Sequence, residues 1–294
     1  MSWKGICFIG WQRKEPCMNR AVSVVLLALA AAFSDFAQEK AAETKPAATA
    51  ETRLPSADEI LDKYVEALGG KAAFEKFSSR VVKGALELPA MGITSGAEIY
   101  AKAPNKWLLS IEVPGFGLVQ QGYDGTSGWA RDPQTGIRDL SGGELESIKR
   151  GAEFNQPLKL KALFPKLEVK EKSKVGDREV YVLEATPAQG SPEKLYFDTK
   201  THLLVRADIE AEGPQGKTPF EIGFEDYKEV DGIKLAHTVS RSSPAMSFVI
   251  KLEEIRHNIP IEDTKFQKPA PEKPPEKPVE KPAEKPAAEE KKTP

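Results

Sequence analysis

Three histidines carry most of the acid–base chemistry that this 294-residue chain could offer: His202, His237 and His257. No two of them lie three or four residues apart, so the helical histidine pairs of protease-type zinc sites are absent. His237 shares an alternating strand face with apolar residues and has no acidic or nucleophilic neighbour in sequence. That pattern favours a buried, hydrogen-bonded histidine over a general base. The carboxylates lie on alternating polar faces and are typical of solvent-side charge, although two of them could still meet in space as acid and base.

The glycine-containing segments complete no nucleotide-binding or nucleophile motif. Gly115-Phe116-Gly117 is not followed by a helix pattern, and Gly125-Thr126-Ser127-Gly128 has its last glycine one place early for a nucleophile elbow. Both cysteines, Cys7 and Cys17, lie near the N-terminus, so the rest of the chain has no thiol nucleophile, disulfide or Cys-containing zinc site. We therefore expect no enzyme activity, no catalytic residue, no metal and no cofactor.

The first 37 residues have the pattern of an export signal. Arg20 precedes a nearly uncharged apolar run, Ala21–Phe33, which is shorter than the roughly 20 apolar residues that span a bilayer. Small residues follow, so we expect cleavage and export to the periplasm, or secretion beyond it, with no transmembrane segment left. An uncleaved anchor is the alternative. Met18 could itself begin a compact signal, in which case residues 1–17 would not be translated.

Two polar segments flank one domain, which we place at residues 56–266. Residues 38–55 bury too little apolar surface to offset their ordering entropy, which predicts a disordered linker. Residues 267–294 repeat a Glu-Lys-Pro unit, which favours extended polyproline-II and predicts a disordered tail. The tail is either a spacer that reaches envelope proteins or a solvated extension without a partner. A net charge of −2 gives no basic surplus for nucleic acid.

Helical patterns open the domain and recur once in its middle. Ser56-Ala57-Asp58-Glu59 matches a capping box, and the helix behind it ends at Gly69-Gly70. A second capping box, Ser141-Gly142-Gly143-Glu144, predicts a helix to about Glu153. Residues 157–164 form a third short apolar segment, which is a further candidate helix.

Nearly every other segment alternates apolar and polar residues with period two. In residues 106–113, for example, Trp107, Leu109 and Ile111 fall on one face of a strand. Turn signals separate ten to twelve such strands at hairpin spacing, and no strand–helix–strand alternation occurs. The pattern predicts a mainly β (α+β) fold, an antiparallel sheet that is strongly curved or part-closed, with the few helices packed on one face.

A set of turn-and-strand signatures runs through most of this domain. They are Lys102-x-Pro104-Asn105, Asp124-Gly125, Trp129 with Asp132-Pro133, Tyr196-Phe197-Asp198, Phe224-Glu225-Asp226-Tyr227 and Val230-Asp231-Gly232-Ile233. In these signatures the chain resembles the outer-membrane lipoprotein-sorting proteins of the bacterial envelope, the LolA/LolB-like superfamily. Such turn signatures speak for fold more strongly than for activity.

The resemblance implies a curved antiparallel half-barrel, here of about eleven strands, whose apolar concave face is covered by helices. Carriers of this family hold the acyl chains of lipoproteins there while crossing the periplasm. They have an arginine immediately before the proline of the Pro-Asn pair, which ties down a helical lid, whereas this chain has Ala103. A relative that binds another apolar ligand, or that stays near a partner through the tail, is therefore an equal alternative to a lipoprotein carrier.

From this resemblance we expect a periplasmic, non-enzymatic binding protein or carrier for the acyl chains of lipid or lipoprotein, with its cavity near the hairpin Trp107–Tyr123. An envelope scaffold or assembly module without a small ligand is the alternative, and a hydrolase is less favoured. Alternation does not tell which strand face is concave, and Trp129 is alternatively a core aromatic. The candidate cavity residues are Trp107, Leu109, Ile111, Trp129, Leu203, Val205, Phe220 and Phe224.

The export signal leads to the first testable prediction. The mature protein should begin within residues 33–38, because the apolar core is too short to remain as a membrane span. N-terminal sequencing of exported material checks this prediction. A mature protein that begins at Met1 or Met18 would contradict it.

Overall fold

The computed structural model describes residues 53–213 and 216–270. The predicted signal peptide (1–37), nearly all of the predicted linker (38–55) and most of the predicted tail (267–294) lie outside these ranges, so those predictions stay untested. Within the described ranges, no helix combines the length and the apolar character needed to cross a membrane.

The described chain contains four α-helices, two short 3₁₀ helices and thirteen strands. The helices are α1 Ala57–Ala67, α2 Lys71–Phe74, α3 Gly142–Gly151, α4 Gln156–Leu163, η1 Pro89–Met91 and η2 Asp263–Phe266. The strands are β1 Ser79–Leu88, β2 Ile93–Lys102, β3 Lys106–Val113, β4 Gly117–Tyr123, β5 Gly128–Asp132, β6 Gly136–Asp139, β7 Lys166–Val175, β8 Arg178–Thr186, β9 Glu193–Asp198, β10 Leu204–Gly213, β11 Gly216–Val230, β12 Ile233–Ser242 and β13 Ser247–His257.

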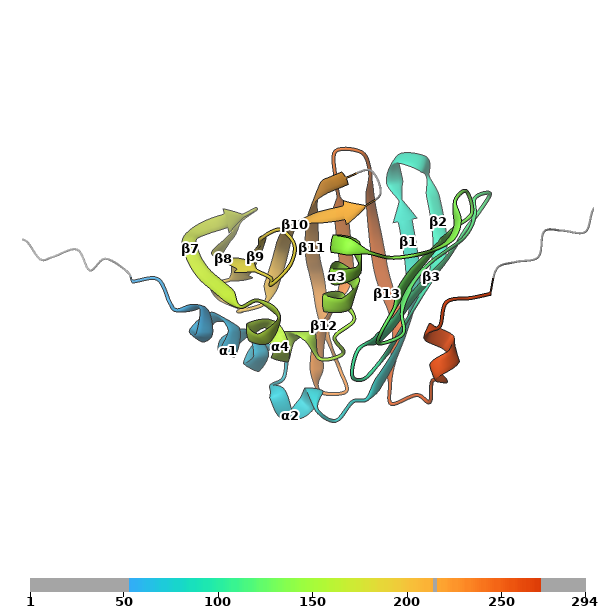
Figure 1. Cartoon of the computed structure of the whole chain (residues 1–294). Helices are drawn as coiled ribbons and strands as arrows, with labels where there is room; N and C mark the ends of the chain where they lie inside the picture. The colour runs from blue at the N-terminus through green and yellow to red at the C-terminus, as the bar shows by residue number, and fades with distance from the viewer. Residues whose placement is uncertain (1–52, 214–215, 271–294) are drawn as a thin grey trace, which may run out of the picture. The chain divides into compact units, whose positions relative to one another are not determined.

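All thirteen strands belong to one antiparallel sheet, in the order β6-β5-β4-β3-β2-β1-β13-β12-β11-β10-β9-β8-β7. The sheet curls without closing (Figure 1), which confirms the predicted curved, mainly β fold. The count is thirteen rather than about eleven; the last two strands at one end of the sheet, β5 and β6, have only five and four residues and carry little periodic signal. Every neighbouring pair is also consecutive in sequence except β1 and β13, which join the two halves of the sheet.

The helices cover the hollow face of the sheet, which we call the concave face. Helix α1 contacts α4 and β7, while α3 contacts β10 on one side and β4 and β5 on the other. Figure 1 shows α3 in front of the hollow between the two halves. The largest apolar core lies under α1, α2 and α4, where the Tyr64 ring meets the edge of Phe197 with centroids 5.1 Å apart. Directly paired residues of an antiparallel ladder share a face, so strand register assigns side chains to the concave or the opposite, convex, face.

The two predicted capping boxes have different outcomes. At α1 the predicted box is confirmed, because Glu59 N–H donates to Ser56 Oγ (3.2 Å) and Ser56 N–H donates to Glu59 Oε2 (2.7 Å). Helix α3 begins after Ser141 as predicted, but the Ser141 side chain caps nothing. The prediction of a box there was wrong because Glu144 accepts two hydrogen bonds from the Arg138 guanidinium, at 2.6 and 2.7 Å. The third predicted helix is confirmed as α4.

The segment after β13, residues 258–268, crosses the convex face, and we call it the C-terminal strap. Phe266 is fully buried against Trp129, whose indole N–H donates to the Phe266 carbonyl oxygen (2.8 Å). Gly122 makes room for this tryptophan, since a Cβ at that position would lie 2.5 Å from the indole ring. Asp263 pairs with Lys102 (2.8 Å) and Lys106 (2.7 Å), which holds the strap at its middle. Figure 1 shows η2 outside β3, on the side away from α3.

The strap leads to a stability prediction. Phe266→Ala should lower the free energy of unfolding by about 3–5 kcal/mol, because it leaves a cavity where a phenyl ring was fully buried. Urea titration followed by tryptophan fluorescence measures this change.

Truncation after Gln267 provides the matched control for Phe266→Ala. Within the described residues it removes the exposed ion pair of Lys268 with Asp139, a kind of contact that contributes little. The thermal midpoint should therefore stay unchanged within error. A clear drop on truncation, or none in Phe266→Ala, would contradict this assignment of the strap.

Candidate functional site

A cavity of about 510 Å³ lies between the concave face of the sheet and helices α3 and α4. Both halves of the sheet contribute to its wall, and so does Tyr64 of α1. The apolar and aromatic lining residues are Tyr64, Trp107, Ile148, Pro157, Leu160, Phe164, Leu195, Leu204, Ala207, Ile209, Ala211, Ile222 and Phe224. The polar ones are Gln121, Glu144, Ser147, Arg150, Gln156, Glu193, Glu210, Glu212 and Arg241.

The apolar wall exists because the helices cover only part of the concave face. Ile222 and Phe224 of β11 and Trp107 of β3 are only half-buried, although each belongs to an alternating apolar strand face. Half-buried apolar side chains around a concave space are typical of small-molecule sites, whose volumes run from roughly 300 to 1,000 Å³. The cavity falls within this range.

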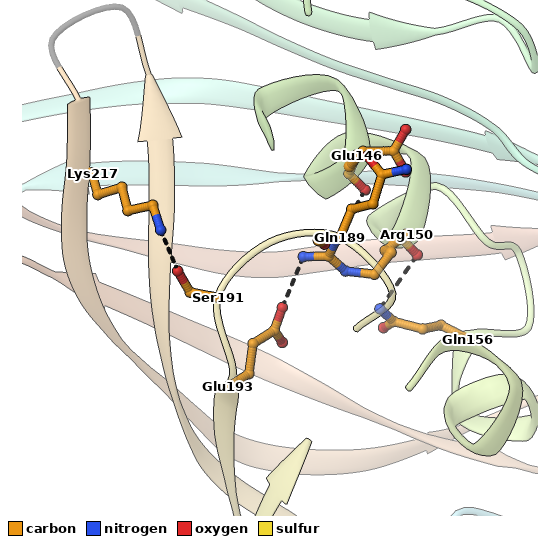
Figure 2. A network of polar contacts seen from close by, with 7 residues as sticks. All are labelled: Glu146, Arg150, Gln156, Gln189, Ser191, Glu193 and Lys217. Atoms are coloured by element: carbon orange, nitrogen blue, oxygen red, sulfur yellow. Dashed lines mark hydrogen bonds and ion pairs between the residues drawn. The ribbon is translucent and has the colours of Figure 1, made fainter. Parts of the chain in front are cut away.

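A polar network centred on Arg150 of α3 borders the cavity (Figure 2). Its guanidinium donates to Glu193 Oε1 (3.0 Å) and to the carbonyl oxygens of Gln189 (3.1 Å) and Glu146 (3.4 Å). Gln156 donates to the Arg150 carbonyl (3.5 Å), which links α3 to α4. Burial raises the pKa of the Glu193 carboxyl, while the Arg150 guanidinium opposes that rise. The network fastens α3 to the start of β9 and so holds the helix over the cavity.

Arg241 of β12 is part of the cavity wall that the sheet forms. It pairs in register with Ile222 and with Phe248, which places its side chain on the concave face. Its guanidinium lies over the Phe220 ring, with Cζ 4.0 Å from the ring centroid. Its Nε is buried and has no hydrogen-bond partner among the described residues. The sequence analysis missed Arg241; its only signal was a cation on an apolar strand face.

The structure brings several of the predicted site residues to the concave face. Trp107 and Phe224 line the cavity. Leu109 and Ile111 follow Trp107 on the same face, but pack into a neighbouring apolar cluster with Leu86. Phe220 is paired with Ile209 and lies under Arg241.

The other three predicted residues lie elsewhere. Trp129 is 1% exposed and lies beneath the C-terminal strap on the convex face. Val205 packs with Val180 and Val182 in a separate buried cluster. Leu203 packs against the main core, and its neighbour Leu204 lines the cavity instead. The hairpin from Trp107 to Tyr123 contributes Trp107 and Gln121, whereas strands β9 to β12 supply most of the sheet wall.

Two of the three histidines, His237 and His257, take part in structural side-chain hydrogen bonds. His237 is buried and its Nδ1 lies 2.9 Å from the Leu235 carbonyl oxygen, which confirms the predicted hydrogen-bonded histidine. In His257, Nε2 accepts from Arg80 Nε–H (3.0 Å), so Nδ1 carries the proton and donates to Asp231 Oδ2 (2.8 Å). Neither nitrogen of His257 is free to act as a base. Within residues 53–213 and 216–270, no group of three or more His, Cys, Asp or Glu could hold a metal ion.

His257 leads to a pH prediction. Burial, and secondarily the Arg80 cation, hold the pKa of His257 below its ordinary value of 6.5, although Asp231 opposes the shift. As the pH falls, His257 therefore becomes protonated in the unfolded chain before it does in the folded one. The stabilisation that neutral His257 gives the folded state is complete above about pH 6.5 and is lost as the pH falls below that value. Unfolding titrations between about pH 7.5 and 5.5 should show a shallower decline in His257→Gln than in the wild type. Equal slopes would contradict this role.

Comparisons with known proteins concern the fold. No family model matches the chain. No curated protein matches it at a significant level either. A DUF1329 family protein from Desulfovibrio piger is 16% identical with a TM-score of 0.50, over 71% of this chain and 96% of that one. A LolA superfamily protein from Nitrosomonas europaea is 15% identical with a TM-score of 0.49, over 73% and 99%. An outer membrane lipoprotein-sorting protein domain from Vibrio parahaemolyticus is 15% identical with a TM-score of 0.48, over 71% and 96%.

At these identities the comparisons speak for architecture and not for activity. Two of these neighbours are named for the LolA superfamily and for lipoprotein sorting. The chain shares its fold with the DUF1329 family protein.

Proposed function

We propose that this chain is an exported, non-enzymatic binding protein that holds a long apolar chain, such as an acyl chain of lipid or lipoprotein, in the cavity under α3. The observation that carries the proposal is the cavity itself, which is lined by half-buried apolar side chains from both halves of the sheet. Export rests on the predicted signal peptide, which places the protein in the periplasm. The tail then serves as a spacer that keeps the domain near its envelope partners.

The energy available from the cavity suits such a ligand. Each buried methylene group contributes about 0.8 kcal/mol, so ten of them contribute about 8 kcal/mol before the costs of association. The network around Arg150 already holds α3 over the cavity in the absence of ligand, so ligand binding costs less in ordering of the protein. Micromolar binding then needs no specific polar contact.

A binding role also agrees with how the acid–base groups are used. The pair of His257 and Asp231 resembles part of a catalytic triad, but Arg80 occupies the other imidazole nitrogen. The Arg150–Glu193 pair fastens two elements of the fold. Glu193 lines the cavity but is held by Arg150, and Arg80 blocks His257, so we expect no hydrolysis of a bound lipid.

Titration of delipidated protein with a fluorescent fatty acid tests the proposal. We expect saturable micromolar binding that survives high salt, because burial of apolar surface is not screened by ions. A folded, ligand-free protein that shows no saturable binding would contradict the proposal and favour an assembly module.

Two tryptophan substitutions on α3 locate the site. Ser147 lines the cavity, so Ser147→Trp should fill it and weaken binding at least about tenfold. Lys149 is exposed on the same helix, so Lys149→Trp should bind like the wild type and controls for the new side chain. Equal affinities of the two variants would place the ligand elsewhere. Unchanged far-UV circular dichroism shows that both variants fold.

A further inference from the structure

Arg241 is an uncompensated positive charge in the cavity wall. No hydrogen bond or ion pair to its guanidinium occurs among the described residues, and its Nε is buried without a partner. Burial lowers the pKa of Arg241 below its ordinary value, and no carboxylate counteracts this shift. Arg241 as a whole is half-buried, but its Nε is shielded from water, so this donor loses its hydration without replacement. The Phe220 ring face, 4.0 Å from Cζ, replaces only part of that hydration.

The acidic residues around the cavity are already engaged. Glu144 is held by Arg138, Glu193 by Arg150, and Glu210 lies 3.9 Å from Lys217. The exposed Glu212 lies against Gly143 in the first turn of α3, where the helix dipole favours a negative charge. None of them neutralises Arg241.

Arg80 provides an instructive contrast with Arg241. It too has one buried and unpartnered nitrogen, Nη2. Its Nε, however, donates to His257, and Arg80 is not among the residues that line the cavity. Of these two arginines, each with one buried and unpartnered nitrogen, Arg241 alone lines the cavity.

We propose that Arg241 binds the oxyanion head of an amphiphile, a carboxylate or a phosphate, whose apolar chain fills the cavity. This inference rests on the proposed binding function and adds a ligand class to it. A guanidinium presents several N–H donors in a planar fork that suits both oxyanions. Ile222 and Phe224, on the neighbouring strand β11, line the cavity beside Arg241 and would contact the chain next to its charged head.

Displacement of a neutral fluorescent probe, N-phenylnaphthylamine, by ligands of one chain length tests this inference. Dodecanoate, dodecyl phosphate and dodecanol are each titrated below their micelle concentrations. The two anions should displace the probe at concentrations at least about tenfold lower than the alcohol, because a charge-assisted hydrogen bond is gained. Whichever anion binds tighter identifies carboxylate or phosphate as the preferred head.

Three variants assign the preference to Arg241. Arg241→Met should bind the anions and the alcohol within about threefold of each other, and Arg241→Lys should keep part of the preference. Arg256, exposed and on the convex face, provides the control Arg256→Met, which should behave like the wild type. Without ligand, Arg241→Met should melt no lower than the wild type, since it removes a buried N–H donor that has no partner.

The outcomes separate this inference from the function on which it rests. If the wild type binds acid and alcohol equally, or Arg241→Met keeps the anion preference, this inference is wrong while the binding function stands. If the wild type binds neither the probe nor any of the three ligands, both are wrong. A lower melting temperature for ligand-free Arg241→Met, together with an unchanged preference, would assign Arg241 a structural role.

Discussion

A single sheet that curls without closing has more apolar surface on its hollow side than a few short helices can cover. In this protein α1, α2 and α4 cover part of the half built from β7 to β13, and α3 reaches from β10 across to β4 and β5. Several apolar side chains between these supports, among them Trp107, Ile222 and Phe224, are only half-buried. Incomplete coverage of one sheet by its helices is therefore the constraint from which the cavity, its lining and its polar border all follow. A closed barrel or a fuller helical layer would have removed the space.

The polar groups around this space do two different kinds of work. The network of Arg150 with Glu193 joins a helix to the sheet, and both side chains find partners within the protein. Arg241 is left with an aromatic ring and an unpartnered nitrogen. Proteins tolerate such local cost at functional sites and compensate for it elsewhere, here with a well-packed core around Phe197 and Leu183. Whether an arginine has a partner within the protein therefore separates the structural Arg150 from the proposed ligand-binding Arg241, which their positions in the sequence do not.

Local periodicity was enough to predict the sheet, its curvature class and the capping box at Ser56, because these depend on neighbouring residues. It could not predict which face is hollow, since alternation is the same for both faces of a strand. Trp129 shows the consequence: its burial depends on Phe266, 137 residues later, and no local pattern contains that contact. Arg241 was missed for the same reason, because its lack of a partner is a property of the assembled cavity. The predicted capping box at Ser141 did not form, because Glu144 binds the more distant Arg138 instead of the Ser141 backbone.

The seam between β1 and β13 has a consequence for how the chain is made. Strands β2 to β6 add to β1 one hairpin at a time, so this half of the sheet can form as soon as it leaves the ribosome. The other edge of β1 has no partner until β13 arrives, more than 150 residues later. During that interval Val82, Gly84 and Leu86 present an open apolar strand edge, which is the geometry that pairs with other chains. The ladder that unites the finished sheet is therefore also the place where an unfinished chain is most exposed to aggregation.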